Sequence, residues 1–202
     1  MRTYGGKTHA ERRAERRERL LDAGLELFGT RGYPQTTIEQ ICAAARLNPR
    51  YFYEEFDSRE ALLGAVYERH VLAVADRVRE AVEAAAPDAR TRLEVGLRAF
   101  LDGSLADERA ARINYFEVVG VSPELERLRR RVLGEYADMI ALQLRALAGD
   151  TPLAAGHPRL AAVALAGATD GLIIDWLSGE RGYDREAIVE TLSAIFGGAL
   201  SP

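Results

Sequence analysis

Apolar side chains recur every three to four residues along most of the chain, a spacing typical of amphipathic α-helices. Ala, Leu, Glu and Arg abound while β-branched residues are few, so intrinsic propensity also favours helix. Gly, Pro and Asp separate the periodic segments and predict where helices end. We therefore expect an all-α fold of about nine helices: 10–28, 38–46, a short helix opened by Pro49, 59–86, 90–105, 108–119, 123–148, 158–179 and 184–198.

The stretch 36–56 contains two short helices joined by a tight turn. Thr36 and Thr37 each stand three positions before a Glu or Gln, and these two overlapping capping boxes predict that a helix begins here. Asn48 then caps a second helix, whose first position suits Pro49 because proline lacks the N–H that would be unpaired there. This outline is that of a helix-turn-helix.

The second of these helices directs polar residues outward. Leu47, Phe52 and Phe56 can close a small core, which leaves Arg50 and two tyrosines pointing away from it. Arginine can bond guanine bidentately and tyrosine hydroxyls reach phosphates, so the pattern suits a major groove. A plain packed helical hairpin is the alternative interpretation.

The N-terminus carries the chain's positive charge. The whole chain has a net charge of −4, but its first 20 residues hold seven Arg and Lys against three Glu. A duplex backbone would attract this segment, and we expect residues 1–9 to form a flexible basic arm. A solvated arginine-glutamate helix face would give the same composition.

A specific combination of motifs covers roughly residues 15–62. It comprises Leu27-Phe28, Arg31-Gly32-Tyr33, Thr36-Thr37-Ile38, Ile41, Ala44-Ala45, Leu47-Asn48, Tyr53, Phe56 and Ser58-Arg59-Glu60-Ala61-Leu62. This combination resembles the N-terminal domain of TetR-type transcriptional regulators. The resemblance implies a ligand-responsive regulator, most often a repressor, that binds a palindromic operator as a homodimer and is released by a small effector.

The resemblance also implies a domain layout and a set of contacts. Residues 1–62 would form the three-helix DNA-binding head, and 63–202 the helical body that binds effector and dimerises. We expect phosphate contacts from Thr37, Tyr53 and Arg59. We expect base-edge or sugar contacts from residues 48–51, at the start of the second short helix, which would be the recognition helix. The expected DNA-binding residues are Thr36, Thr37, Asn48, Pro49, Arg50, Tyr51, Tyr53 and Arg59.

Three positions depart from the family pattern. Arg46 and Arg50 stand where such sequences commonly have glycine, and Glu55 stands where histidine is usual. The operator sequence therefore cannot be carried over. Glu54 and Glu55 would repel a nearby phosphate unless they turn away or pair with Arg46 or Arg59.

The body offers candidates for an effector pocket and for a dimer interface. Aromatic and polar side chains on helices that should be buried are costly without partners, so a ligand could contact Phe100, Tyr115, Met139, Asp170 and Trp176. Core or interface roles are alternatives for each of these residues.

The helix 158–178 is apolar on nearly all sides and rich in small residues, and the last helix has one apolar stripe. Two such helices per subunit could form a four-helix bundle through Ala164, Gly167, Gly171, Ile188, Leu192 and Ile195, and burial within one chain is the alternative.

Other chemistry has little support in the sequence. The single cysteine, Cys42, fits a small core position, and no apolar leader opens the chain, which points to the cytoplasm. The apolar stretch 160–177 contains two aspartates, so we expect a buried helix there and no membrane span. The three histidines lack metal-ligand spacing, and no nucleophile elbow or phosphate loop is present. We expect no enzyme, metal or cofactor; a helical ligand-binding or scaffold protein that does not bind DNA is the competing hypothesis.

Overall fold

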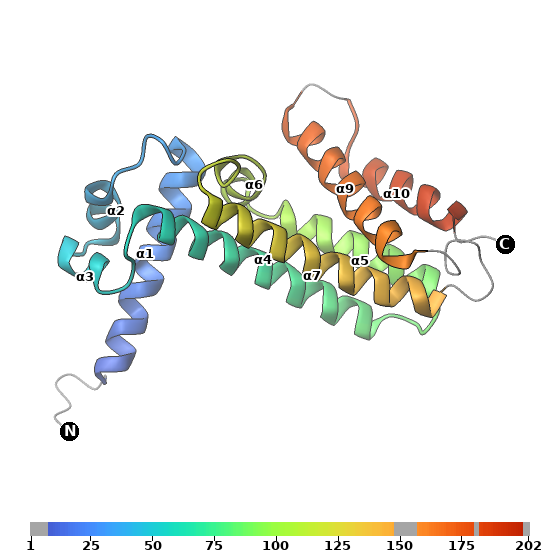
Figure 1. The fold of residues 1–202 in the computed structure, drawn as a ribbon, viewed down its shortest axis with the longest axis horizontal. Helices are drawn as coiled ribbons and strands as arrows, with labels where there is room; N and C mark the ends of the chain where they lie inside the picture. The colour runs from blue at the N-terminus through green and yellow to red at the C-terminus, as the bar shows by residue number, and fades with distance from the viewer. Residues whose placement is uncertain (1–7, 148–156, 180–181, 200–202) are drawn as a thin grey trace. The chain divides into compact units, whose positions relative to one another are not determined.

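The computed structural model describes residues 8–147, 157–179 and 182–199, and within these ranges it is all helical, as the sequence predicts (Figure 1). The expected arm falls mostly on residues 1–7, which lie outside the described residues. The described elements are α1 (His9–Arg31), α2 (Ile38–Ala45), α3 (Pro49–Tyr53), α4 (Arg59–Ala84), α5 (Ala89–Ser104), α6 (Glu108–Arg112), the π-helical turn η1 (Ile113–Glu117), α7 (Pro123–Leu147), α9 (Pro158–Leu177) and α10 (Arg185–Ala199).

The chain divides into two compact units, and the division is discontinuous in sequence. The first unit, here called the head, comprises Met1–His70 together with Ala106–Glu126. The second unit, the body, comprises Val71–Leu105 and Arg127–Pro202. This division differs from the expected boundary after residue 62, because α6 and η1 belong with α1 and α4 contributes residues to both units.

Helix α1 begins at a capping box that the sequence did not lead us to expect. The side chain of Thr8 accepts from the backbone N–H of Glu11, while the Glu11 carboxylate accepts from the backbone N–H of Thr8. At the other end Gly32 has φ 93°, a left-handed conformation that glycine adopts without strain, and it ends the helix. Tyr33 then packs on Phe28 with ring centroids 5.7 Å apart.

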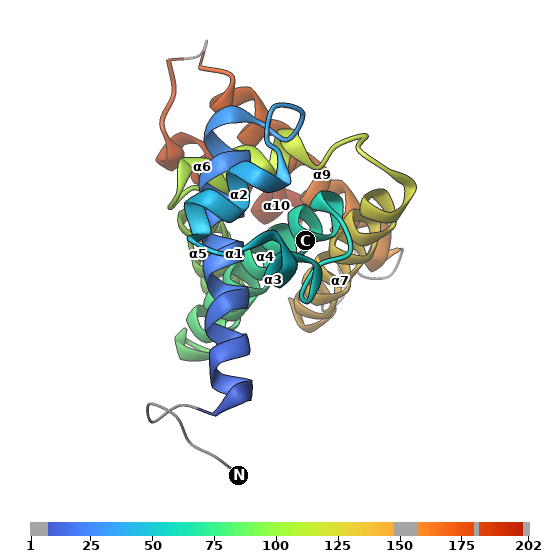
Figure 2. The same ribbon diagram turned by 90° about the vertical axis from the view of Figure 1, so that its left-hand side faces the viewer.

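The core of the head closes around the apolar faces of α1, α2, α3 and the first turns of α4, and Figure 2 shows these helices together. Its fully buried side chains come from all four helices, which fixes their mutual positions. Cys42 is buried among them, as predicted, and burial raises the pKa of its thiol. The largest of these side chains are Leu20, Phe28, Ile41, Phe52, Leu62 and Leu63.

The segment expected as one helix over 108–119 is divided into α6 and the π-helical turn η1. Both pack against α1. Arg109 pairs with Glu26 at 2.6 Å, and the Glu117 carboxylate accepts from the backbone N–H of Tyr33 at 2.7 Å. The widened turn changes which residues of this segment face α1, a change that apolar periodicity alone does not encode.

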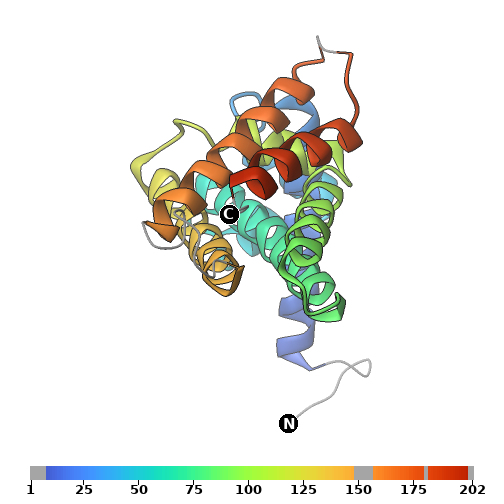
Figure 3. The ribbon, with the colours of Figure 1, turned by 90° about the vertical axis from the view of Figure 1, so that its right-hand side faces the viewer.

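The body is a helical bundle in which α9 packs on α7 and α10 packs on α5 and α9 (Figure 3). Small residues allow the first of these approaches, because Ala137 and Ala141 of α7 meet Ala162 of α9. The C-terminal half of α4 packs on α5 through Val74, Val78 and Ala99. Arg98 of α5 donates to both carboxylate oxygens of Glu186, which ties α10 to the bundle.

Candidate nucleic-acid interface and effector cavity

The turn between α2 and α3 is held in an unusual backbone conformation. Arg46 has φ 54° and ψ 47°, and it is the one non-glycine residue with positive φ in the described part of the chain. The backbone N–H of Leu47 then donates to the carbonyl of Cys42 at 2.9 Å. Glycine is usual at this position in the family that the sequence resembles, and the left-handed geometry explains why.

Helix α3 begins as the sequence predicts. The Asn48 side chain accepts from the backbone N–H of Arg50 at 2.9 Å, and Pro49 takes the first helical position. Phe52 is fully buried and anchors the helix. The opposite face, which we call the α3 face, is exposed and consists of Asn48, Pro49, Arg50, Tyr51 and Tyr53.

The two threonines before α2 have different roles. Thr37 is exposed and caps α2 through a capping box with Gln40. Thr36 is fully buried, and its hydroxyl donates to the carbonyl of Gly32 at 2.8 Å. The expectation that Thr36 contacts DNA is therefore wrong, because its side chain faces the core of the head.

Arg59 supports the loop before α2. Its guanidinium donates to the carbonyl of Thr36 and lies 4.2 Å from the centroid of the Tyr33 ring. The residue is half-buried. The Arg59 guanidinium is thus bound within the head. It would have to leave the Thr36 carbonyl and the Tyr33 ring before it could contact a phosphate.

The two glutamates at the end of α3 pair with arginines that the sequence did not single out. Arg13 and Arg16 of α1 are their partners, with Arg50 as a third, whereas Arg46 and Arg59 were the expected ones. The spacing along α1 could have revealed these partners, because Arg13 and Arg16 fall on the same helical face as the core residue Leu20. The charged turns of α1 thus lie against α3.

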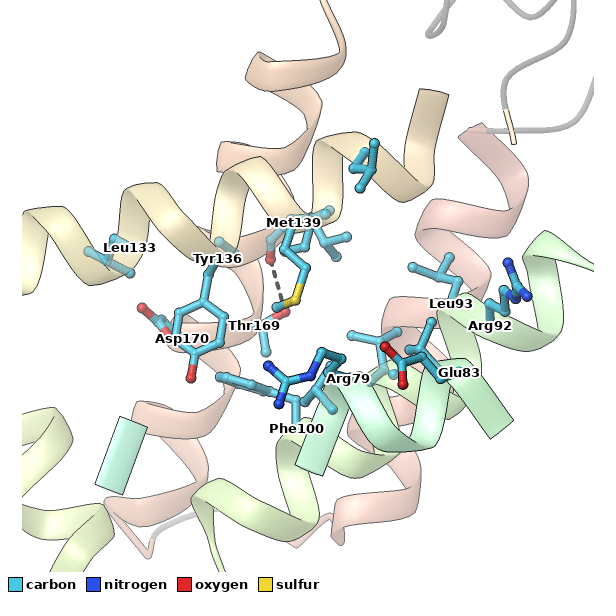
Figure 4. Close-up of a pocket in the computed structure, with 18 residues that line it drawn as sticks. Arg79, Glu83, Arg92, Leu93, Phe100, Leu133, Tyr136, Met139, Thr169 and Asp170 are labelled. Atoms are coloured by element: carbon cyan, nitrogen blue, oxygen red, sulfur yellow. Dashed lines mark hydrogen bonds between the residues drawn. The ribbon is translucent and has the colours of Figure 1, made fainter. Parts of the chain in front are cut away.

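The body contains a cavity of about 370 Å³ (Figure 4). Helices α4, α5, α7 and α9 each contribute to its wall, and most of the lining side chains are apolar. Of the residues expected to bind ligand, three line it: Phe100, Met139 and Asp170. Helical periodicity indicates which side chains face inward but not where a cavity lies, so it gave no signal for the other apolar wall residues, among them Val78, Val82, Leu97, Ile140 and Leu165.

Two other expected ligand contacts lie elsewhere, so those expectations are corrected. Tyr115 is buried in η1, which belongs to the head and contributes nothing to the cavity wall. Trp176 is absent from the wall as well, and the guanidinium of Arg185 lies 5.5 Å from the centroid of its ring. Sequence reasoning could identify costly buried aromatics but not the element against which each one packs.

Charged groups line the cavity at separate places. In Figure 4, Asp170 and Tyr136 are drawn at the left of the cavity, Arg79 near its centre, and Glu83 and Arg92 at the right. Burial raises the pKa of the Asp170 carboxyl to about 6, against a smaller lowering by the charge of Arg129. The hydroxyl of Thr169 next to it donates to the carbonyl of Leu165 at 2.9 Å. The cavity can therefore hold an apolar molecule with a hydrogen-bonding group at Asp170.

The six residues expected at a dimer interface fall into two groups. Ala164, Gly167 and Gly171 of α9 are exposed, and Ile195 of α10 is 54% exposed. Ile188 and Leu192 are fully buried in the core of their own chain. These two cannot reach a partner without unpacking the body, so they are corrected to core residues.

Comparison with known proteins yields consistent results. The family model described as "Bacterial regulatory proteins, tetR family" matches residues 20–66. The HTH-type transcriptional activator FasR of Mycolicibacterium smegmatis is 30% identical over 200 residues, which covers 98% of this chain and 90% of that protein. The chain belongs to the TetR family.

Solved structures show the same fold for this TetR-family regulator. The fatty acid degradation regulator FadR of Bacillus halodurans has a TM-score of 0.80 at 20% identity, covering 92% of this chain and 95% of that one. FadR of Bacillus subtilis in complex with stearoyl-CoA has a TM-score of 0.74 at 19% identity, covering 91% and 97%. The chain is thus a TetR-family transcriptional regulator with a helix-turn-helix head and a helical body.

Proposed function

We propose that the protein is a ligand-responsive transcriptional regulator that works in the cytoplasm and binds a palindromic operator as a homodimer. The observation that carries this proposal is the exposed α3 face, presented by a helix whose opposite side is anchored by the buried Phe52. Residues that read DNA must be held rigidly while remaining accessible, and this arrangement meets both conditions.

The DNA contacts follow from exposure. Asn48, Pro49, Arg50 and Tyr51 would contact base edges and sugars, with Arg50 able to bond a guanine bidentately. Tyr53 is 59% exposed and would reach a phosphate with its hydroxyl, as would the N-terminus of α2 at Thr37.

The dimer would form through α9 and the end of α10. Helix α9 is long and apolar enough to cross a membrane by length and composition, yet only 22% of that stretch is buried within the chain. Leu160, Val163 and Ile174 are exposed there, beside the exposed small residues Gly167 and Gly171. A second copy covering this surface would bury the apolar side chains, and Asp170 and Asp175 on the same helix disfavour a lipid environment.

The effector would be a largely apolar molecule held in the body. The apolar wall of the cavity supports this class, and a neutral or cationic hydrogen-bond donor would suit Asp170. Stearoyl-CoA in the Bacillus subtilis FadR structure supports an acyl chain as the first compound class to examine. Binding would favour one conformation of the body and thereby change DNA affinity.

The direction of regulation has two candidates. Repression with release by effector is what the resemblance to TetR-type proteins implies. Activation is the second candidate, because a relative that matches along nearly the whole chain is named a transcriptional activator. Transcription from a promoter carrying the operator, measured with and without the protein, decides between them.

An electrophoretic mobility shift with DNA fragments flanking the gene tests the proposed function. We expect salt-sensitive, sequence-selective retention, and native mass spectrometry of the purified protein should reveal an apolar molecule bound in the body. No retention even at low salt, with the bound molecule removed, would contradict DNA binding. That result would favour the alternative of a helical ligand-binding protein without DNA-binding activity.

A further inference from the structure

Two adjacent glutamates lie at the edge of the α3 face. A carboxylate at this place opposes the approach of a phosphate backbone, so each one weakens DNA binding unless it has a compensating role. Glu54 and Glu55 both have arginine partners, but the partners differ in their exposure and in the elements they belong to.

Glu55 joins α1 to the end of α3. Its side chain is 3% exposed, and its carboxylate accepts from Nε of Arg13 at 2.8 Å. Its backbone carbonyl accepts from Arg17, whose guanidinium also lies 4.5 Å from the centroid of the Phe56 ring. Glu55 is therefore part of the internal framework of the head.

Glu54 makes a different set of contacts. One carboxylate oxygen pairs with Nε of Arg50 at 3.2 Å, and the other lies 3.8 Å from a terminal nitrogen of Arg16. The guanidinium of Arg16 lies 4.6 Å from the centroid of the Tyr51 ring. One carboxylate thus joins the two central side chains of the α3 face, Arg50 directly and Tyr51 through Arg16.

The pair matters because Arg50 has a long side chain that could adopt many conformations at the surface. Its side chain is 83% exposed, and a long flexible arginine beside DNA can bond either a base edge or a phosphate. Contact with a base confers sequence preference, whereas contact with a phosphate confers none. A carboxylate that holds Nε leaves the terminal nitrogens free for a guanine and repels phosphate from the same place.

We propose that Glu54 is a specificity-determining positioning residue, which holds Arg50 and Tyr51 in orientations that read bases while contacting no base itself. This inference rests on the proposed DNA-binding function. In this role Glu54 increases the ratio of the affinity for the preferred sequence to the affinity for other sequences. Its negative charge at the same time lowers the affinity for every sequence.

The test compares two variants of Glu54 with a charge control. Glu54→Gln removes the charge, and Glu54→Asp keeps the charge but shortens the side chain so that it cannot hold Arg50 and Arg16 together. Asp57→Asn is the control, since Asp57 is exposed, close in sequence, and loses the same charge. The probe is the duplex that the wild-type chain selects from a random-sequence pool. The base pair read by Arg50 is the one at which Arg50→Ala loses discrimination.

We expect both Glu54 variants to lose about threefold of the discrimination at that base pair, a size typical of an exposed ion pair. Glu54→Gln should also bind all duplexes more tightly, and its salt dependence should steepen by roughly one phosphate contact as Arg50 moves to the backbone. Asp57→Asn should bind all duplexes more tightly and keep the wild-type ratio. If Glu54→Gln does not fold, judged by its helical circular dichroism, Glu54→Asp gives the answer.

The outcomes separate the inference from the proposed function. Selective wild-type binding together with an unchanged ratio in Glu54→Asp would overturn the role of Glu54 alone. A ratio that falls as much in Asp57→Asn as in Glu54→Gln would overturn it too, because the cause would then be charge and not position. A wild-type chain that retains every duplex equally would overturn both proposals.

Discussion

Gly29 of α1 and Arg109 of α6 approach so closely that no side chain fits between them. A Cβ built on Gly29 would lie 2.7 Å from the Cα and 2.8 Å from the carbonyl oxygen of Arg109. Both neighbours are backbone atoms, which cannot rotate away. The side chain of Arg109 also pairs with Asp107 and Glu26, each at 2.6 Å. The contact therefore fixes α6 against α1.

Gly29→Ala should destabilise the protein by about 1–3 kcal/mol, since the added methyl forces the two backbones apart. Urea unfolding followed by circular dichroism measures the effect. Gly134→Ala is the matched control, because Gly134 lies within α7 and a Cβ at this position would meet no atom within 4 Å in the ranges that the structure describes. That substitution should stabilise by roughly 0.5–1 kcal/mol through helix propensity. Equal effects of the two substitutions would contradict the close approach.

Arg46→Gly should stabilise the head by about 0.5–1 kcal/mol. The left-handed conformation of Arg46 is unfavourable for a residue with a Cβ, and glycine relieves that strain. Arg46→Ala removes the same side chain without relieving the backbone, and it should give no stabilisation. Thermal unfolding of the two variants side by side measures the difference, and a gain in the alanine variant equal to that in glycine would exclude backbone strain as the cause.

Asp170→Asn should stabilise the protein at pH 7 and not at pH 4. Because burial raises the pKa of Asp170 to about 6, the folded state holds a proton that the unfolded state releases. Stability is therefore lost as pH rises from about 4 through 6, by up to roughly 3 kcal/mol. Burial lowers the pKa of His70 and outweighs the opposing charge of Asp107, so His70 makes stability rise with pH. This contribution is the same in the wild-type protein and in the variant, and it cancels in the comparison. A pH-independent difference between the two proteins would refute the titration.

Gly167→Leu should weaken dimerisation without unfolding the chain. No atom of the described residues lies within 4 Å of a Cβ at Gly167, so the leucine has room beside this part of its own subunit. A partner helix packed closely on this surface would meet the leucine, with an expected cost of about 1–3 kcal/mol per overpacked site. Sedimentation equilibrium gives the dimer dissociation constant. Gly96→Leu is unsuitable as a control variant, because Gly96 lines the cavity. An unchanged dimer with intact helicity would remove Gly167 from the interface.

Local signals predicted most of the fold. The capping box at Thr37 and the Asn48-Pro49 start of α3 depend on residues within four positions of each other, so sequence alone identifies them. Glu117 with Tyr33 and Arg109 with Glu26 join residues more than 80 positions apart, and no periodicity reveals such pairs. The same reason explains why Thr36 and Tyr115 were assigned to sites, although each side chain is buried in the head.

In the proposed function, two copies of the α3 face read DNA together. A footprint of the wild-type protein on the duplex that it selects from a random pool tests whether they do. We predict two protected patches whose centres lie about 34–36 Å apart along the duplex, which is one helical turn. The sequences of the two patches should be related as the halves of a palindrome. Protection of a single patch, or equal protection of a scrambled duplex, would contradict the account.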